Sequence, residues 1–149
     1  MGITIRKATK NDLSEVLSLI KELALFEKQP QEVTITLEQL EQDGFGEHPL
    51  YWIILAEENG GIVGMSFYYI RYSTWKGRCL YLEDLVVKEK YKQQGIGKLL
   101  FEATLKEAKK MDAKLMNWQV LDWNEPAIQF YKKFNAELDD EWINGKIRL

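Results

Sequence analysis

The sequence predicts a fold of the α/β (α+β) class, with a mixed, mostly antiparallel central sheet flanked by about four helices. Two observations lead to this prediction. Segments with strand-like patterns cluster in the middle of the chain, and segments with helical spacing lie before and after them. The chain has 149 residues, of which 46% are hydrophobic, so we expect a single domain spanning 1–149 with its own core.

The first strand is expected at about residues 3–7, where Ile3 and Ile5 alternate with polar residues. A capping box formed by Thr9 and Asp12 then opens a helix, because apolar residues recur at helical spacing over residues 13–24. Residues 28–34 are expected to form a loop, interrupted by Pro30.

A second capping box, Thr36 with Gln39, predicts a short helix that stops near Gly44. Strands are expected at residues 51–57, 62–72 and 78–87. A hairpin turn at residues 58–61 joins the first two, since Asn59 and Gly60 accept positive φ.

The second half predicts a long helix over residues 95–111, a strand over 114–121 and a helix over 125–134 that Asn124 caps. The tail, residues 137–149, is expected to hold one or two final strands. The side chains expected to face inward from the long helix are Leu99, Leu100, Ala103 and Ala108.

Composition excludes several functional classes. No apolar run approaches the roughly 20 residues that span a bilayer, and residues 1–12 lack the apolar core of a signal peptide. A single cysteine, Cys79, cannot form an internal disulfide, and a single histidine, His48, cannot build a His-rich metal site. We therefore expect a cytoplasmic protein without a metal or a membrane partner. The net charge of −3 argues against a nucleic-acid partner.

Charge is unevenly distributed along the chain. Residues 22–58 contain nine acidic residues and one lysine, whereas residues 88–110 contain seven lysines and three glutamates. This distribution suits a cationic substrate near the first region and an anionic cofactor near the second, although two solvated helical faces would give the same pattern.

The segment Leu80–Leu100 carries the strongest functional signal. A buried strand containing Glu83 and Asp84 is followed by a glycine turn and a helix that starts near Gly95. Unpaired N–H groups and the helix dipole at such a terminus can hold a pyrophosphate. The segment lacks the Gly-Lys-Ser/Thr of a P-loop and the third glycine of a dinucleotide fingerprint.

Two motifs in this order resemble those of the GNAT superfamily of N-acetyltransferases. The first is the [Gln/Arg]-x-x-Gly-x-[Gly/Ala] loop after an apolar strand, and the second is an Asn followed by a helix carrying a Tyr, here residues 123–131. The segments LIKELA (19–24), DGFGEHP (43–49), YLED (81–84) and WNEPAIQFYKKF (123–134) further resemble the diamine and polyamine (spermidine/spermine) acetyltransferases and their thialysine-acetylating relatives.

The resemblance implies that acetyl-CoA (coenzyme A) is the cofactor. Backbone groups of residues 85–87 would pair with the pantetheine arm, and backbone amides of residues 92–97 would hold the pyrophosphate. Lys92 departs from the usual Arg or Gln. The residues expected to bind the cofactor are Leu85, Val86, Val87, Lys92, Gln93, Gln94, Gly95, Ile96, Gly97, Lys98, Asn124, Ala127 and Tyr131.

Amine acetylation requires a neutral amine and a protonated leaving thiolate. We predict Glu83 as the base and Tyr131 as the acid, because a phenol can protonate a departing thiolate and Tyr131 follows Asn124 by about two helical turns. Asp84 would instead hold the cationic end of the substrate. Adjacent strand residues point to opposite faces, so we also predict a local irregularity near residues 82–85.

Acids beside aromatic residues suit an aliphatic polycation. Phe26 stands where a Tyr is common in the polyamine enzymes, and Trp75 lacks the acid often found just before it, so a short diamine or thialysine is favoured over spermine. The residues expected to bind the amine are Phe26, Glu27, Glu32, Trp75, Glu83, Asp84 and Trp142.

Other functions remain open at this point. The substrate could be thialysine, another amino acid or a protein amine, and the chain could be a non-catalytic acyl-CoA-binding module. The joint presence of Glu83, Asn124 and Tyr131 argues against a pure binder, which needs only the pyrophosphate loop. The resemblance also implies a homodimer.

Overall fold

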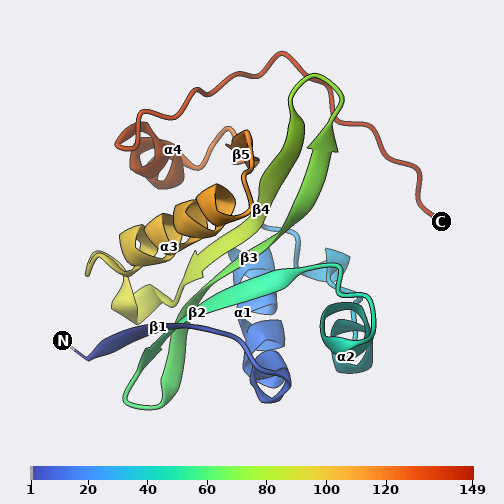
Figure 1. Ribbon diagram of the computed structural model, residues 1–149. Helices are drawn as coiled ribbons and strands as arrows, with labels where there is room; N and C mark the ends of the chain where they lie inside the picture. Colours follow the sequence, from blue (N-terminus) through green and yellow to red (C-terminus); the bar gives the residue numbers. More distant parts are fainter. Residues whose placement is uncertain (1) are drawn as a thin grey trace. The chain divides into compact units, whose positions relative to one another are not determined.

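The computed structural model describes residues 2–149, which divide into two compact units, the first ending at Gln119 and the second spanning Val120–Leu149 (Figure 1). The first unit contains the sheet and three of the helices, and the second contains a short helix and the tail. That the two units together form one domain stays a prediction. Every helix in the described residues is too short or too polar to cross a bilayer.

The sheet of the first unit has five strands in sequence order. They are β1 (Ile3–Lys7), β2 (Trp52–Glu58), β3 (Gly61–Ser73), β4 (Gly77–Val87) and β5 (Leu115–Asn117). Neighbouring strands are antiparallel from β1 to β4, and β5 lies parallel to β4. The β2–β3 turn uses Asn59 at φ 51° and Gly60 at φ 81°, as its sequence predicted. The predicted mixed, mostly antiparallel sheet is confirmed.

The described residues contain four α-helices: α1 (Leu13–Phe26), α2 (Leu37–Phe45), α3 (Ile96–Lys110) and α4 (Glu125–Lys132). Short 3-10 turns lie at Lys10–Asp12, Pro30–Glu32 and Glu89–Tyr91. Both predicted capping boxes form. In the first, the Thr9 N–H donates to Asp12 Oδ2 at 2.7 Å, and Arg6 also donates to that carboxylate, so the pKa of Asp12 falls to about 2.

Helices cover both faces of the sheet in the first unit (Figure 1). On one face, α1 and α2 pack on β2 and β3 through a core that includes Leu13, Val16, Leu40 and Met65. On the other face, α3 contacts β3 through a buried hydrogen bond of 2.6 Å between Ser66 and Thr104. Neighbouring residues of β3 therefore pack against different helices, Met65 against α1 and α2 and Ser66 against α3.

The buried stripe of α3 differs from the predicted one. Leu100 and Ala108 are buried as expected and Ala103 is partly exposed, but Leu99 is 42% exposed, so its predicted inward position is wrong. Successive residues on a helix lie about 100° apart, so Leu99 and Leu100 cannot share one narrow stripe. Thr104 takes a core position because its hydroxyl is hydrogen-bonded.

The C-terminal strands were overpredicted. The strand expected at 114–121 is reduced to Leu115–Asn117, and residues 136–149 contain no strand or helix. A strand requires a partner for its backbone groups, and β5 pairs only with the first part of β4. In the tail, Trp142, Ile143 and Ile147 are more than three-quarters exposed.

Candidate active site

A bulge in β4 lies where the sequence has its two adjacent acids. Phe67 of β3 pairs with Asp84 and Tyr68 pairs with Leu82, so Glu83 has no partner in β3. An extra residue in one strand interrupts the alternation of side chains between faces. The irregularity predicted near residues 82–85 is therefore confirmed.

The bulge directs both acidic side chains to the sheet face that α1 covers. Asp84 lies opposite Phe67, which stacks on Tyr51 in the core under α1 and α2. Glu83 shares this face because Tyr69, two residues beyond Phe67 in β3, donates its hydroxyl to Glu83 Oε1 at 3.1 Å. The two carboxylates can thus address one ligand.

A third carboxylate, Glu27, approaches the pair from the end of α1. Burial and then the charges of Glu83 and Glu27 raise the pKa of Asp84 to about 7. Burial and the charge of Glu83 also raise the pKa of Glu27. The structure therefore brings together three of the acids predicted for the amine site.

Aromatic rings that the sequence analysis missed lie beside these acids. The rings of Tyr69 and Tyr81 are 5.3 Å apart, and the Arg71 guanidinium lies 5.5 Å from the Tyr81 ring. Burial and the neighbouring Glu83 raise the pKa of Tyr69 to about 12. The period-two alternation of Phe67, Tyr69 and Arg71 in β3 is the signal that could have identified them.

The glycine loop before α3 has the form of an anion cradle. Gly95 is the N-cap of α3 with φ 82°, and Gln93 also has positive φ, so successive backbone N–H groups can point outward. The loop from Lys92 to Gly95 is exposed, and no heavy atom lies within 4 Å of a Cβ built on Gly95. The first turn of α3 contains no acidic residue.

The cradle and the acidic face are close to each other. The Lys92 ammonium lies 5.0 Å from the centre of the Phe26 ring, at the end of α1 next to Glu27. On its β5 side, β4 is paired only from Cys79 to Tyr81, so no strand of the described residues covers Leu85–Val87 there. This edge can accept an extended ligand as an added strand.

Sequence comparison identifies the family. The profile described as "Acetyltransferase (GNAT) family" matches residues 13–136. The chain belongs to this acetyltransferase (GNAT) family. It is similar to the thialysine N-epsilon-acetyltransferase of Bos taurus, with 40% identity over 143 residues that cover 91% of this chain and 84% of that protein.

Two further similarities concern the polyamine enzymes and the fold. Spermidine/spermine N(1)-acetyltransferase-like protein 1 of Homo sapiens is 36% identical over 139 residues, which are 89% of this chain and 20% of that protein. A solved aminoglycoside N-acetyltransferase in complex with CoA has a TM-score of 0.76 at 17% identity, and covers 99% of this chain and 95% of that one. As a member of the GNAT family, the chain is an N-acetyltransferase whose cofactor is acetyl-CoA.

The GNAT motif in the second unit forms as expected within that unit. Asn124 caps α4, and the Ala127 N–H donates to its Oδ1 at 3.4 Å. Tyr131 lies in the last turn of α4 and is 8% exposed, with its ring 5.4 Å from that of Phe130. These residues stay candidates for the cofactor arm and the acid.

One residue expected at the amine site, Trp75, is not brought to the acids. Trp75 lies in the β3–β4 turn and is 83% exposed. Tyr69, which contacts Glu83, lies four residues before the end of β3. The turn that holds Trp75 therefore begins roughly 13 Å from Tyr69 along the strand. Glu32, in the turn after α1, and Trp142, in the tail of the second unit, stay candidates for the amine site.

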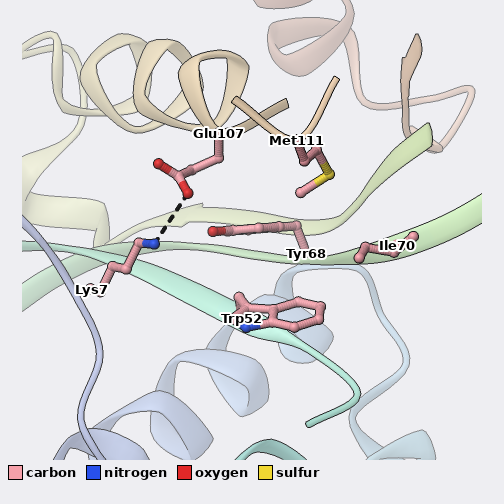
Figure 2. Close-up of a pocket in the computed structure, with 6 residues that line it drawn as sticks. All are labelled: Lys7, Trp52, Tyr68, Ile70, Glu107 and Met111. Carbon is pink, nitrogen blue, oxygen red and sulfur yellow. Dashed lines mark ion pairs between the residues drawn. The ribbon is translucent and has the colours of Figure 1, made fainter. Parts of the chain in front are cut away.

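A small pocket lies on the opposite face of the sheet (Figure 2). Its volume is about 100 Å³, and it is lined by Lys7, Trp52, Tyr68, Ile70, Glu107 and Met111. Lys7 and Glu107 form an ion pair of 3.1 Å across its end. Ligand pockets usually have several hundred Å³. This pocket is therefore too small for the substrate or the cofactor of a GNAT enzyme.

Proposed function

We propose that this GNAT enzyme transfers the acetyl group of acetyl-CoA to a primary amine of a small diamine or polyamine by direct attack on the thioester. One observation carries the proposal: Glu27, Glu83 and Asp84 converge on one face beside Phe26, Tyr69 and Tyr81. A cluster of carboxylates and aromatic rings attracts an aliphatic polycation through charge and cation–π contact.

The proposed roles divide between the two units. In the first, backbone amides of residues 92–97 hold the pyrophosphate, the open edge at Leu85–Val87 pairs with the pantetheine arm, and a carboxylate of the Glu83–Asp84 pair accepts the ammonium proton. In the second, Asn124 binds the pantetheine arm and Tyr131 protonates the leaving thiolate. The bound cofactor supplies the acetyl thioester.

Thialysine is the second candidate substrate. The 40% identity to the thialysine enzyme supports it, and so does the Arg71 guanidinium next to Tyr81. An amino-acid substrate carries a carboxylate that a diamine lacks, and Arg71 can pair with it while the acids hold the ammonium groups.

The test is a turnover screen with acetyl-CoA and putrescine, spermidine, spermine, thialysine, lysine or a peptide panel. Turnover with diamines at a kcat/KM above that of peptides is expected. If acetyl-CoA raises the melting temperature but no amine is acetylated, the chain is a binding module and the proposal is wrong.

Arg71→Gln separates the two substrate classes in the same assay. If thialysine is the substrate, this variant should raise its KM about tenfold and leave that of putrescine unchanged. Arg78→Gln is the matched control, because Arg78 donates instead to the Met111 carbonyl beyond the end of α3. An equal effect of both substitutions on thialysine would remove Arg71 from recognition.

Three broader proposals accompany the function. Residues 1–149 form a single acetyltransferase domain, which is supported by the match over residues 13–136 across both compact units. The protein is a homodimer, which is supported by the exposed apolar residues of the tail. It works in the cytoplasm, which is consistent with a single, unpaired cysteine.

A further inference from the structure

We propose that Tyr69 is a positioning residue, which fixes the carboxylate of Glu83 where the substrate amine has to meet it. The inference rests on the proposed function and adds to it a residue that acts through another side chain. A carboxylate on a freely rotating side chain reaches the amine in only a fraction of its conformations, and a misplacement of about 1 Å can cost roughly 100-fold in rate. Holding Glu83 in one conformation therefore favours attack on the thioester.

The bulge leaves Glu83 with little support from the sheet. In the register of β3 and β4, its neighbours Leu82 and Asp84 have partners but Glu83 has none. Glu83 is also exposed. A glutamate side chain in this situation has several accessible rotamers, and confining it costs conformational entropy. A contact from a neighbouring side chain is thus needed to hold the carboxylate in place.

Tyr69 provides that contact from a ring that is itself held. Tyr69 faces Tyr81 in the register of β3 and β4, and their rings are 5.3 Å apart at an angle of 33°. The Tyr69 ring also packs against the core that includes α1 and α2. From there its hydroxyl donates to Glu83 Oε1 at 3.1 Å. The hydrogen bond therefore joins an exposed carboxylate to the packed interior of the first unit.

The hydrogen bond leaves Glu83 able to act on the substrate. A carboxylate has about four acceptor sites on its two oxygens, so one donor from Tyr69 leaves sites for the ammonium of an amine. Burial and the charge of Glu83 raise the pKa of Tyr69 to about 12, so its hydroxyl stays a donor at neutral pH. Tyr69 thus orients the carboxylate without occupying it.

The test is a double-mutant cycle on kcat and KM for putrescine, with the wild type, Tyr69→Phe, Glu83→Ala and the double variant. Tyr69→Phe keeps the ring in the core and removes only the hydroxyl. We expect it to lower kcat about tenfold and to change KM less than about twofold, because all the acids that attract the cation are retained. In the Glu83→Ala background, Tyr69→Phe should cause no further loss, since its effect passes through Glu83.

Tyr68→Phe is the matched control for the loss of a hydroxyl. Tyr68 is the preceding residue of β3, but it lines the small pocket on the opposite face of the sheet (Figure 2). This variant should leave kcat and KM for putrescine unchanged. Wild-type kcat in Tyr69→Phe, or an equal fall of kcat in the presence and in the absence of Glu83, would overturn the proposed role.

A measurement without turnover tests the contact itself. The carbon-13 NMR signal of the Glu83 carboxyl group should move in Tyr69→Phe and keep its position in Tyr68→Phe, because only the first variant loses the hydrogen bond. A signal that stays in place in Tyr69→Phe would overturn the inference. If the signal moves but the wild type acetylates no amine, the contact stands, whereas the proposed function is wrong and the positioning role falls with it.

Discussion

The position of Asp84 disfavours the charged form of its carboxyl group. Burial and two neighbouring carboxylates raise its pKa from 3.8 to about 7. The folded protein thus binds more protons than the unfolded chain between these values, so stability falls as pH rises from about 4 to about 7. Carboxylates with depressed pKa values, such as Asp12, act in the opposite direction, and their contribution is lost only as pH falls toward about 2.

Asp84→Asn should consequently stabilise the protein in a pH-dependent way. The amide keeps the shape of the side chain but removes the buried negative charge. We expect a higher melting temperature than wild type at about pH 8 and little difference at about pH 4. Thermal denaturation at several pH values measures this, with Glu89→Gln, at an exposed residue of a 3-10 turn, as the control. A melting temperature that falls at about pH 8 would mean that the carboxylate is stabilised in the folded state.

Tyr131 tests the proposed acid at the same scale. Tyr131→Phe removes one hydroxyl and keeps the ring against Phe130, so the fold should be retained. We expect kcat to fall by about 10²–10⁴-fold with little change in acetyl-CoA binding. Tyr72→Phe, at a tyrosine that is 74% exposed, is the control and should be neutral. Wild-type turnover in Tyr131→Phe would exclude this residue as the acid.

At the scale of elements, the proposed anion cradle at the start of α3 depends on two features, one from the helix and one from the loop before it. The helix presents N–H groups without intrahelical acceptors, and Gly95 at φ 82° turns the preceding loop toward them. The space around Gly95 is open, so its glycine is required by the backbone angle rather than by packing.

Gly95→Glu should abolish the increase in melting temperature that acetyl-CoA causes, because it adds a negative charge to the cradle. Gly60→Glu is a closely matched control, since Gly60 has φ 81° and equally open surroundings but lies in the β2–β3 turn. Both variants should lose similar stability, about 1 kcal/mol from a side chain at positive φ. Only Gly95→Glu should lose the ligand effect in a thermal shift assay. Loss in both would point to general unfolding.

At the scale of the whole molecule, the exposed tail bears on assembly. Trp142, Ile143 and Ile147 are each more than three-quarters exposed, and clustered exposed apolar residues are typical of protein–protein contact sites. We expect the 149-residue chain to sediment as a dimer and Ile147→Asp to sediment as a monomer. Lys146→Asp, at the adjacent exposed residue, is the control and should stay dimeric. A wild type that sediments as a monomer at all concentrations would contradict the proposed homodimer.

Much of the fold could be predicted because local signals agree with the tertiary structure. The capping boxes at Thr9 and Thr36 satisfy N–H groups within a single turn, and the Asn59–Gly60 turn depends only on backbone preferences. The prediction failed where contacts with residues distant in the sequence decide whether a side chain is buried or a strand forms. Leu99 is apolar but 42% exposed, and the tail has strand-like residues but forms no strand.

The sequence by itself determined which chemical groups are available. The glycine loop, the Glu83–Asp84 pair and the Asn124–Tyr131 motif can each be recognised from residue types and their spacing along the chain. The tertiary structure alone decided the surroundings of the acids. The bulge turns both to one face, α1 brings Glu27 toward them, and β3 supplies the Tyr69 hydroxyl to Glu83. A pKa depends on burial and on charges that are distant in sequence, so residues 83 and 84 alone could not have indicated the raised pKa of Asp84.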